Sequence, residues 1–167
     1  MARQTPSPAS SLERAVNIEK EGRDYFLYAS QRAQNELARQ TFQALAGRHG
    51  RHAEQIEQAR RALAEDRRPD TPPALPPRTL FEQIVQRISQ SAAPTAGDIA
   101  ELRTAIVYSL KLRDVHASLT DAAIEDWERT LYNRLRQEEE ALRLTLADTL
   151  NYLRSNFDIT RPPALKQ

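Results

Sequence analysis

The chain has 167 residues, and its 24 Lys+Arg against 23 Asp+Glu leave a net charge of +1. A charge this close to zero creates no overall field that would attract nucleic acid or an anionic membrane, so we expect neither as a partner. Cysteine is absent, which excludes disulfides, thiolate nucleophiles and cysteine-ligated zinc or iron–sulfur centres. No apolar run is long enough to cross a bilayer, and the polar residues 1–11 do not resemble a signal peptide, so a cytoplasmic protein is expected.

The ten prolines divide the chain into two long blocks. They fall only at positions 6–8, 69–77, 94 and 162–163. The intervening residues are rich in Ala, Leu, Arg, Gln and Glu, which favour helices, whereas proline breaks a helix interior. The sequence therefore predicts an all-α protein with two helical blocks joined by a Pro-rich connector.

In chain order, the predicted elements form a single domain over residues 11–160, between a disordered tail at 1–10 and a second tail at 161–167. The first hairpin, 11–65, consists of a helix from Ser10 or Ser11 to about Gln34 and a helix from about Asn35, which can act as its cap, to Glu65. The connector, 66–97, contains one short amphipathic helix from Thr79 to Ser89. The second hairpin, 98–155, consists of helices from about Asp98 to Thr120 and from about Ala122 to Ser155.

The two hairpins resemble each other under a shift of 90 residues. Arg23 maps onto Arg113 and Phe42 onto Tyr132, and the apolar stripes keep this register without a gap from residue 15 to residue 63. We interpret the pattern as a degenerate internal duplication with a pseudo-twofold axis. Helices of about 30 residues are about 45 Å long, so the sequence predicts an up-down four-helix bundle with the connector as its long crossover.

Four ionisable residues interrupt the apolar stripes near their middles: Glu19, His49, His52 and Glu139. Glu19 and His49 are separated by 30 residues, as are Ser109 and Glu139, so antiparallel helices would bring them to the same height. Carboxylates and imidazoles are ligand types that iron, manganese and zinc accept. The four groups therefore predict bound metal, or else a metal-free buried cluster of ion pairs and hydrogen bonds.

Two segments resemble the metal-binding helices of rubrerythrin-like proteins in the ferritin-like superfamily. Residues 18–26 read I-E-K-E-G-R-D-Y-F and resemble the first-helix motif, and residues 42–52 read F-Q-A-L-A-G-R-H-G-R-H and resemble the second-helix segment. The resemblance is good over residues 12–65 and weaker over 98–155. It implies a ferritin-like four-helix bundle in which each hairpin supplies one Glu and one E-x-x-H motif, and the six residues bind two metals.

Position by position, this chain departs from that motif. Glu19 and His52 match a terminal carboxylate and a histidine, and Glu139 matches a bridging carboxylate. His49 stands at the other bridging position. Two positions have lost their ligand, because Ser109 and Leu142 stand there. The resemblance therefore implies a mononuclear site at most, with Glu19, His49, His52 and Glu139 as ligands of one Fe, Zn or Mn ion.

Three further ionisable residues lie near these ligands in the sequence. Glu138 and Glu140 flank Glu139, and we expect both to be solvated, although a register shifted by one position would turn one of them inward instead. His116 lies two turns beyond Ser109, and we expect it to be a core histidine or to support the ligands rather than to bind metal.

Two function classes follow. The first is a metal-binding, rubrerythrin-like protein with a remodelled site and a potential oxidoreductase activity. Its electron donor is unspecified, and the absence of cysteine argues against the peroxidase chemistry that is usual in that family. The alternative is a non-catalytic helical bundle that serves dimerisation or partner binding around a metal-free Glu/His cluster. The resemblance also implies a homodimer. The helix around Phe81–Ile88 would cap the bundle or extend a dimer interface.

Overall fold

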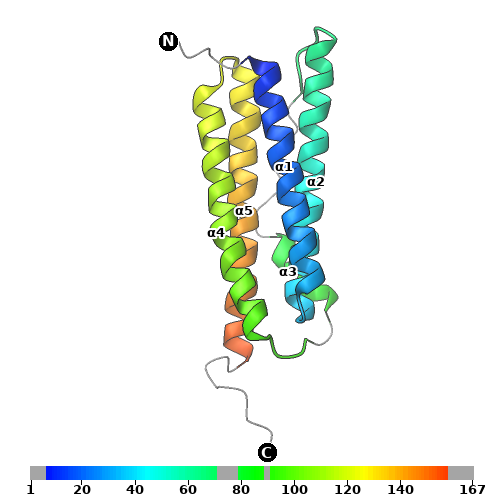
Figure 1. Ribbon diagram of the computed structural model, residues 1–167, viewed down its shortest axis with the longest axis vertical. Coiled ribbons are helices and arrows are strands. Elements are labelled where there is room, and N and C mark those ends of the chain that lie inside the picture. Colours follow the sequence, from blue (N-terminus) through cyan, green and yellow to red (C-terminus); the bar gives the residue numbers. More distant parts are fainter. Residues whose placement is uncertain (1–6, 71–78, 89–90, 158–167) are drawn as a thin grey trace, which may run out of the picture.

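The computed structural model describes residues 7–70, 79–88 and 91–157. The remaining parts of the predicted tails and connector lie outside the described residues. Within the described part there are helices and no strand, which confirms the all-α prediction. The helices are α1 (Pro8–Arg32), α2 (Glu36–Ala64), α3 (Thr79–Arg87), α4 (Ala96–Ala122) and α5 (Asp126–Asn156) (Figure 1).

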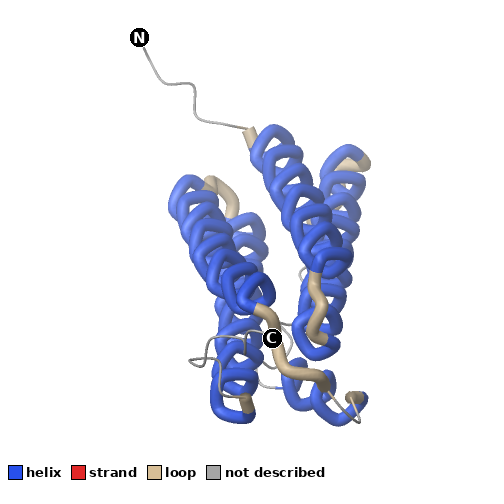
Figure 2. The backbone as a smooth tube through the Cα atoms, turned by 60° about the horizontal axis from the view of Figure 1, so that its bottom comes forward, coloured by secondary structure: helices blue, strands red, loops and turns tan. Residues whose placement is uncertain are grey.

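The four long helices form two antiparallel hairpins, α1 with α2 and α4 with α5, which lie side by side (Figures 1 and 2). In Figure 1, α1 and α5 run downward, whereas α2 and α4 run upward. The hairpins meet where α2 contacts α5 and where α1 contacts α4, and the two helices of each of these pairs are antiparallel. The short α3 packs against α2 and α5 at one end, with Ile84 buried in the core.

Local capping explains where the helices begin, and it corrects two predicted boundaries. The first helix starts at Pro8, because Ser7 caps it by accepting a hydrogen bond from the Ser10 amide and Pro8 suits the first helical position. Residues 8–10, predicted to belong to the tail, are therefore helical. The predicted cap Asn35 is confirmed, since its side chain accepts from the Ala38 amide at 3.0 Å.

The last helix begins at Asp126 rather than near Ala122, after a turn at positions 123–125. This turn repeats that of the first hairpin at the predicted shift of 90 residues. Arg39 donates to the Ala33 carbonyl and pairs with Glu36, while Arg129 donates to the Ala123 carbonyl and pairs with Asp126. The two hairpins therefore share their turn geometry as well as their apolar register.

Two apolar clusters fill the core, one toward each end of the long helices. One contains Phe26, Leu37, Phe42, Leu102 and Leu146, and the other contains Leu12, Ile56, Leu119, Trp127 and Tyr132. Between them, every long helix contributes buried polar side chains. This polar layer holds Glu19, His49, His52, Ser109, His116, Glu138 and Glu139.

Candidate metal centre

Three of the predicted ligands come together in the polar layer. Glu19 of α1 and His49 and His52 of α2 are buried, and one potential ligand atom from each lies within 4.8 Å of the other two. The Glu19 Oε2 atom lies 2.7 Å from His49 Nδ1 and 3.2 Å from His52 Nδ1. His49 and His52 reach the same carboxylate because residues three positions apart in a helix lie on the same face.

The ring of His49 is held between two neighbours on α1. Phe26 stacks on it, with ring centroids 5.3 Å apart and an interplanar angle of 12°. Gly22 lies against its edge, so that a Cβ atom at Gly22 would be only 2.9 Å from Nδ1. The absence of a side chain at Gly22 therefore gives this imidazole its place beside Glu19.

Glu138 is the residue that the sequence interpretation placed wrongly. It was expected in solvent, but it is buried, and its carboxylate bonds to His52 Nε2 while Arg134 pairs with it at 3.2 Å. Along α5, Glu138 and Glu139 are each three or four residues from the core positions Leu135 and Leu142, so both face the interior. Glu138 can accept the Nε2 proton of His52 and leave Nδ1 to face Glu19, which is a common arrangement around histidine ligands.

Glu139, the fourth predicted ligand, lies on the other side of His49. Its Oε2 atom is 3.7 Å from His49 Nε2 and makes no direct hydrogen bond there. Burial and the nearby charge of Glu19 raise the pKa of Glu139, which favours its protonated form. Glu139 therefore faces the ring nitrogen opposite the one that meets Glu19, outside the compact group of three.

His116 reaches the same carboxylate from α4. Its Nε2 atom lies 2.7 Å from Glu19 Oε1, and the imidazole is buried. The sequence indicated that His116 shares an interior stripe with Ser109, but it did not indicate that the side chain meets Glu19. Both oxygens of Glu19 thus face imidazoles, two from the first hairpin and one from the second.

Ionised groups in this layer stabilise one another. Burial alone would raise the pKa of Glu19, yet it lies well below its usual range because the charge of His52 and contacts with His116 and His49 stabilise the carboxylate. Burial would likewise lower the pKa of His52, but Glu19 and Glu138 raise it to about 9. The arrangement of these side chains therefore favours an ionised Glu19 beside a protonated His52.

The donor set and the unpartnered atoms fit a metal ion. Two imidazoles and a carboxylate suit Fe(II), Mn(II) or Zn(II). Buried polar atoms normally have a hydrogen-bond partner, but several in this layer have none of ordinary geometry. They are Glu19 Oε1, His49 Nε2, Ser109 Oγ, both ring nitrogens of His116 and both carboxylate oxygens of Glu139. Ions or ordered water would satisfy such a group.

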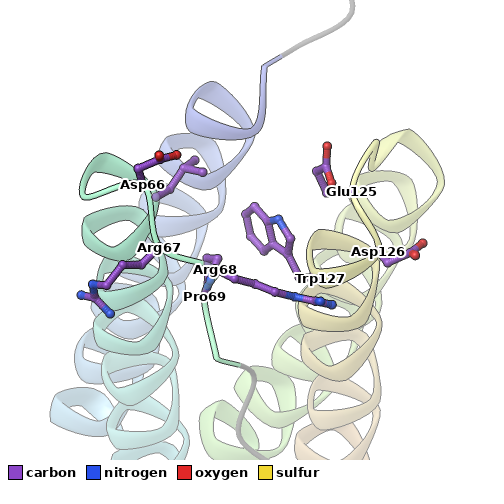
Figure 3. Close-up of a pocket in the computed structure, with 8 residues that line it drawn as sticks. Asp66, Arg67, Arg68, Pro69, Glu125, Asp126 and Trp127 are labelled. Carbon is purple, nitrogen blue, oxygen red and sulfur yellow. The ribbon is translucent and has the colours of Figure 1, made fainter.

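A second feature, a surface cleft of about 360 Å³, lies at the end of the molecule where α2 ends and α5 begins. Figure 3 shows Trp127 at its centre, with Arg68 extending toward α5. Acidic and basic groups both line the cleft, so no ligand charge is favoured. Its lining is Leu63, Asp66, Arg67, Arg68, Pro69, Glu125, Asp126 and Trp127.

Comparison with protein-family models, curated proteins and solved structures yields no match for this chain. None of the described helices combines the length and apolar character that a membrane crossing requires. The geometry of the buried polar layer is therefore the basis for the functional argument.

Proposed function

We propose that this protein binds one divalent transition-metal ion per chain through Glu19, His49 and His52. The observation that carries the proposal is the convergence of these three buried side chains from two adjacent helices, with their ligand atoms within 4.8 Å of one another. Glu138 supports the set by bonding to the outer nitrogen of His52. In this proposal Glu139 faces His49 from the opposite side and does not bind the ion directly.

We further propose that the chain is a ferritin-like four-helix bundle related to rubrerythrin-like proteins. Two antiparallel hairpins, joined so that α2 and α4 run in the same direction, support this assignment, since a ferritin-like bundle needs one long crossover. Ser109 and the buried Leu142 stand where a second metal would need its own ligands. The proposed site is consequently mononuclear.

Such a site could serve redox or structural roles. Two imidazoles and one carboxylate leave coordination positions open, and iron bound in this way supplies one-metal oxidation chemistry, whereas zinc with a filled ligand set is structural. The three residues are at most 2% exposed, so a reactant would have to be small and able to enter the helical core. Oxidoreductase activity is thus an extension of the metal-binding proposal.

Elemental analysis by plasma mass spectrometry tests metal binding directly. The untagged protein is measured as purified and after anaerobic loading with Fe(II), Mn(II) or Zn(II) and desalting. We expect about one ion per chain, lost in His52→Ala and retained in the matched control Ser109→Ala, which also changes a buried polar residue. Two ions per chain would disprove the mononuclear assignment, and none under any loading would disprove metal binding.

One observation favours a second candidate, a metal-free cluster in a non-catalytic bundle. The distances of 2.7 and 3.2 Å from Glu19 to His49 and His52 are ordinary for hydrogen bonds, so these contacts need no ion. This candidate expects no bound metal and a role in dimerisation or partner binding. The homodimer stays a prediction, which sedimentation equilibrium can test.

A further inference from the structure

We propose that His116 is a positioning residue of the metal centre, which holds Oε1 of Glu19 from the second hairpin so that Oε2 faces His49 and His52. This inference rests on the proposed metal-binding function and deepens it. It assigns a role to the second hairpin in a site whose proposed ligands all lie on the first. In this inference His116 does not bind the ion.

The internal repeat shows that the imidazole of His116 departs from the apolar pattern of the core. A shift of 90 residues maps His116 onto Phe26, which lies in one of the two apolar clusters. Both residues are fully buried. Burying an imidazole where the equivalent residue is a phenyl ring is unfavourable unless the nitrogens gain a partner. The contact with Glu19 offsets this cost, so the imidazole at this position is explained by the carboxylate that it meets.

Glu19 divides its two carboxylate oxygens between the hairpins. His116 Nε2 of α4 lies 2.7 Å from Oε1 and forms an ion pair with it. The other oxygen, Oε2, lies 2.7 Å from His49 Nδ1 and 3.2 Å from His52 Nδ1, both of α2. Among the residues that the structure describes, only Glu19, His49 and His52 bring ligand atoms within 4.8 Å of one another, so His116 lies outside the ligand group. It engages the oxygen that the two proposed histidine ligands leave aside.

A glutamate carboxylate needs such a partner to keep one orientation. Rotation about the last bond of the side chain has broad, roughly two-fold energy minima, so the bond itself does not decide which way the oxygens face. A contact at Oε1 fixes the plane of the carboxylate and with it the direction of Oε2. Outer partners of this kind orient metal ligands, and the loss of one lowers metal affinity about 10- to 100-fold.

A second contact between α1 and α4 provides a matched control. Tyr25 of α1 donates a hydrogen bond to Glu101 of α4 at 3.0 Å. Like the ion pair of Glu19 with His116, this bond links the first hairpin to the second, but it involves none of the three proposed ligands. Tyr25→Phe should therefore weaken the link between the hairpins and leave the metal centre intact.

The test compares zinc binding by four proteins: wild type, His116→Phe, His116→Gln and Tyr25→Phe. Competition with a chromophoric chelator measures affinity, and X-ray absorption at the zinc edge counts imidazoles. His116→Phe installs the ring that the first hairpin carries, whereas His116→Gln keeps an N–H group that can donate to Glu19. We expect affinity about 10- to 100-fold below wild type in His116→Phe and close to wild type in His116→Gln and Tyr25→Phe. Two imidazoles should bind zinc in all four proteins.

A packing role for His116 would give the opposite order of affinities, because a phenyl ring keeps the shape of the imidazole better than a glutamine side chain does. Three results would overturn the positioning role. They are wild-type affinity in His116→Phe, an affinity of His116→Gln nearer to that of His116→Phe than to wild type, and a loss in Tyr25→Phe as large as in His116→Phe. Urea unfolding of the metal-free variants shows that each is folded.

The imidazole count separates this inference from the proposed function. A third imidazole on zinc in wild type that is lost in His116→Phe would make His116 a ligand, which would overturn the positioning role and leave metal binding in place. Absence of zinc binding in wild type would overturn the proposed function itself, and this inference with it.

Discussion

Replacing Gly22 with alanine should damage the polar layer, although alanine is the better helix former. A Cβ atom at Gly22 would lie 2.9 Å from His49 Nδ1 and 3.1 Å from two ring carbons. The His49 ring has little room to move away, because Phe26 stacks on it and Glu19 Oε2 lies 2.7 Å from Nδ1. The substitution therefore forces a shift in the side chain that the proposed ion needs.

Gly47 provides the matched control, since it is a mid-helix glycine with an exposed position on α2. A Cβ atom there would meet only Arg51 Nη1 at 3.9 Å, an ordinary contact. Gly47→Ala should therefore increase the free energy of unfolding by about 1 kcal/mol, the usual gain in a helix. In Gly22→Ala the same gain is opposed by about 1–3 kcal/mol of overpacking, so the variant should be between unchanged and about 2 kcal/mol less stable.

Urea unfolding of the metal-free proteins measures these differences, and zinc competition measures the site. We expect zinc affinity to fall about 10- to 100-fold in Gly22→Ala, as when the support of a metal ligand is disturbed, and to stay at the wild-type value in Gly47→Ala. If Gly22→Ala were as stable as Gly47→Ala and bound zinc as tightly as wild type, the argument that Gly22 makes room for His49 would be refuted.

Three other predictions concern charge and register. Glu138→Ala should lower zinc affinity about 10- to 100-fold without changing the number of ions bound, because it removes the partner of His52 Nε2. Chelator competition measures this loss of affinity. In the metal-free protein the pKa of His52 is raised to about 9, so its charged form should stabilise the fold fully below about pH 6.5, and this stabilisation should be lost as the pH rises through 9. Urea unfolding at pH 6, 7.5 and 9.5 should therefore show a free energy of unfolding that falls with pH in wild type, and His52→Gln should lack this fall. Combining Ser109→Glu and Leu142→His with His49→Glu should raise capacity to two ions in elemental analysis, and an unchanged capacity would contradict the rubrerythrin-like register.

The helix boundaries show what local sequence signals can and cannot reveal. Asn35 was recognisable as a cap because its side chain favours that position. The start at Pro8 was missed because a Pro/Ser-rich segment suggested a tail, although proline is also favoured in the first turn of a helix. The turn before Asp126 contains neither glycine nor proline, so no local signal marked it. The internal repeat does locate it, because a shift of 90 residues from the cap Asn35 falls on Glu125, the residue directly before α5.

Helical periodicity and residue spacing were enough to predict the part of the site formed by Glu19, His49 and His52. The separation of 30 residues brought Glu19 and His49 to one height, and the three-residue spacing added His52. Glu138 was placed wrongly because it and Glu139 lie on either side of the centre of the apolar stripe of α5. The sequence does not give the rotation of this helix about its own axis, and in the structure that rotation buries both residues. The contact of His116 with Glu19 depends on how the two hairpins are packed together, and the pattern within one helix does not contain that information.

The asymmetry between the hairpins supports a single metal centre. All three proposed ligands of the compact group lie on the first hairpin, while the second contributes Glu138 and Glu139 from α5 and His116 from α4. At the positions equivalent to Glu19 and His52 the second hairpin has Ser109 and Leu142, which bury no charge. A second set of ionised ligands without an ion would destabilise the core. With Ser109 and Leu142 at these positions instead, the three imidazoles of the layer all contact one carboxylate, Glu19.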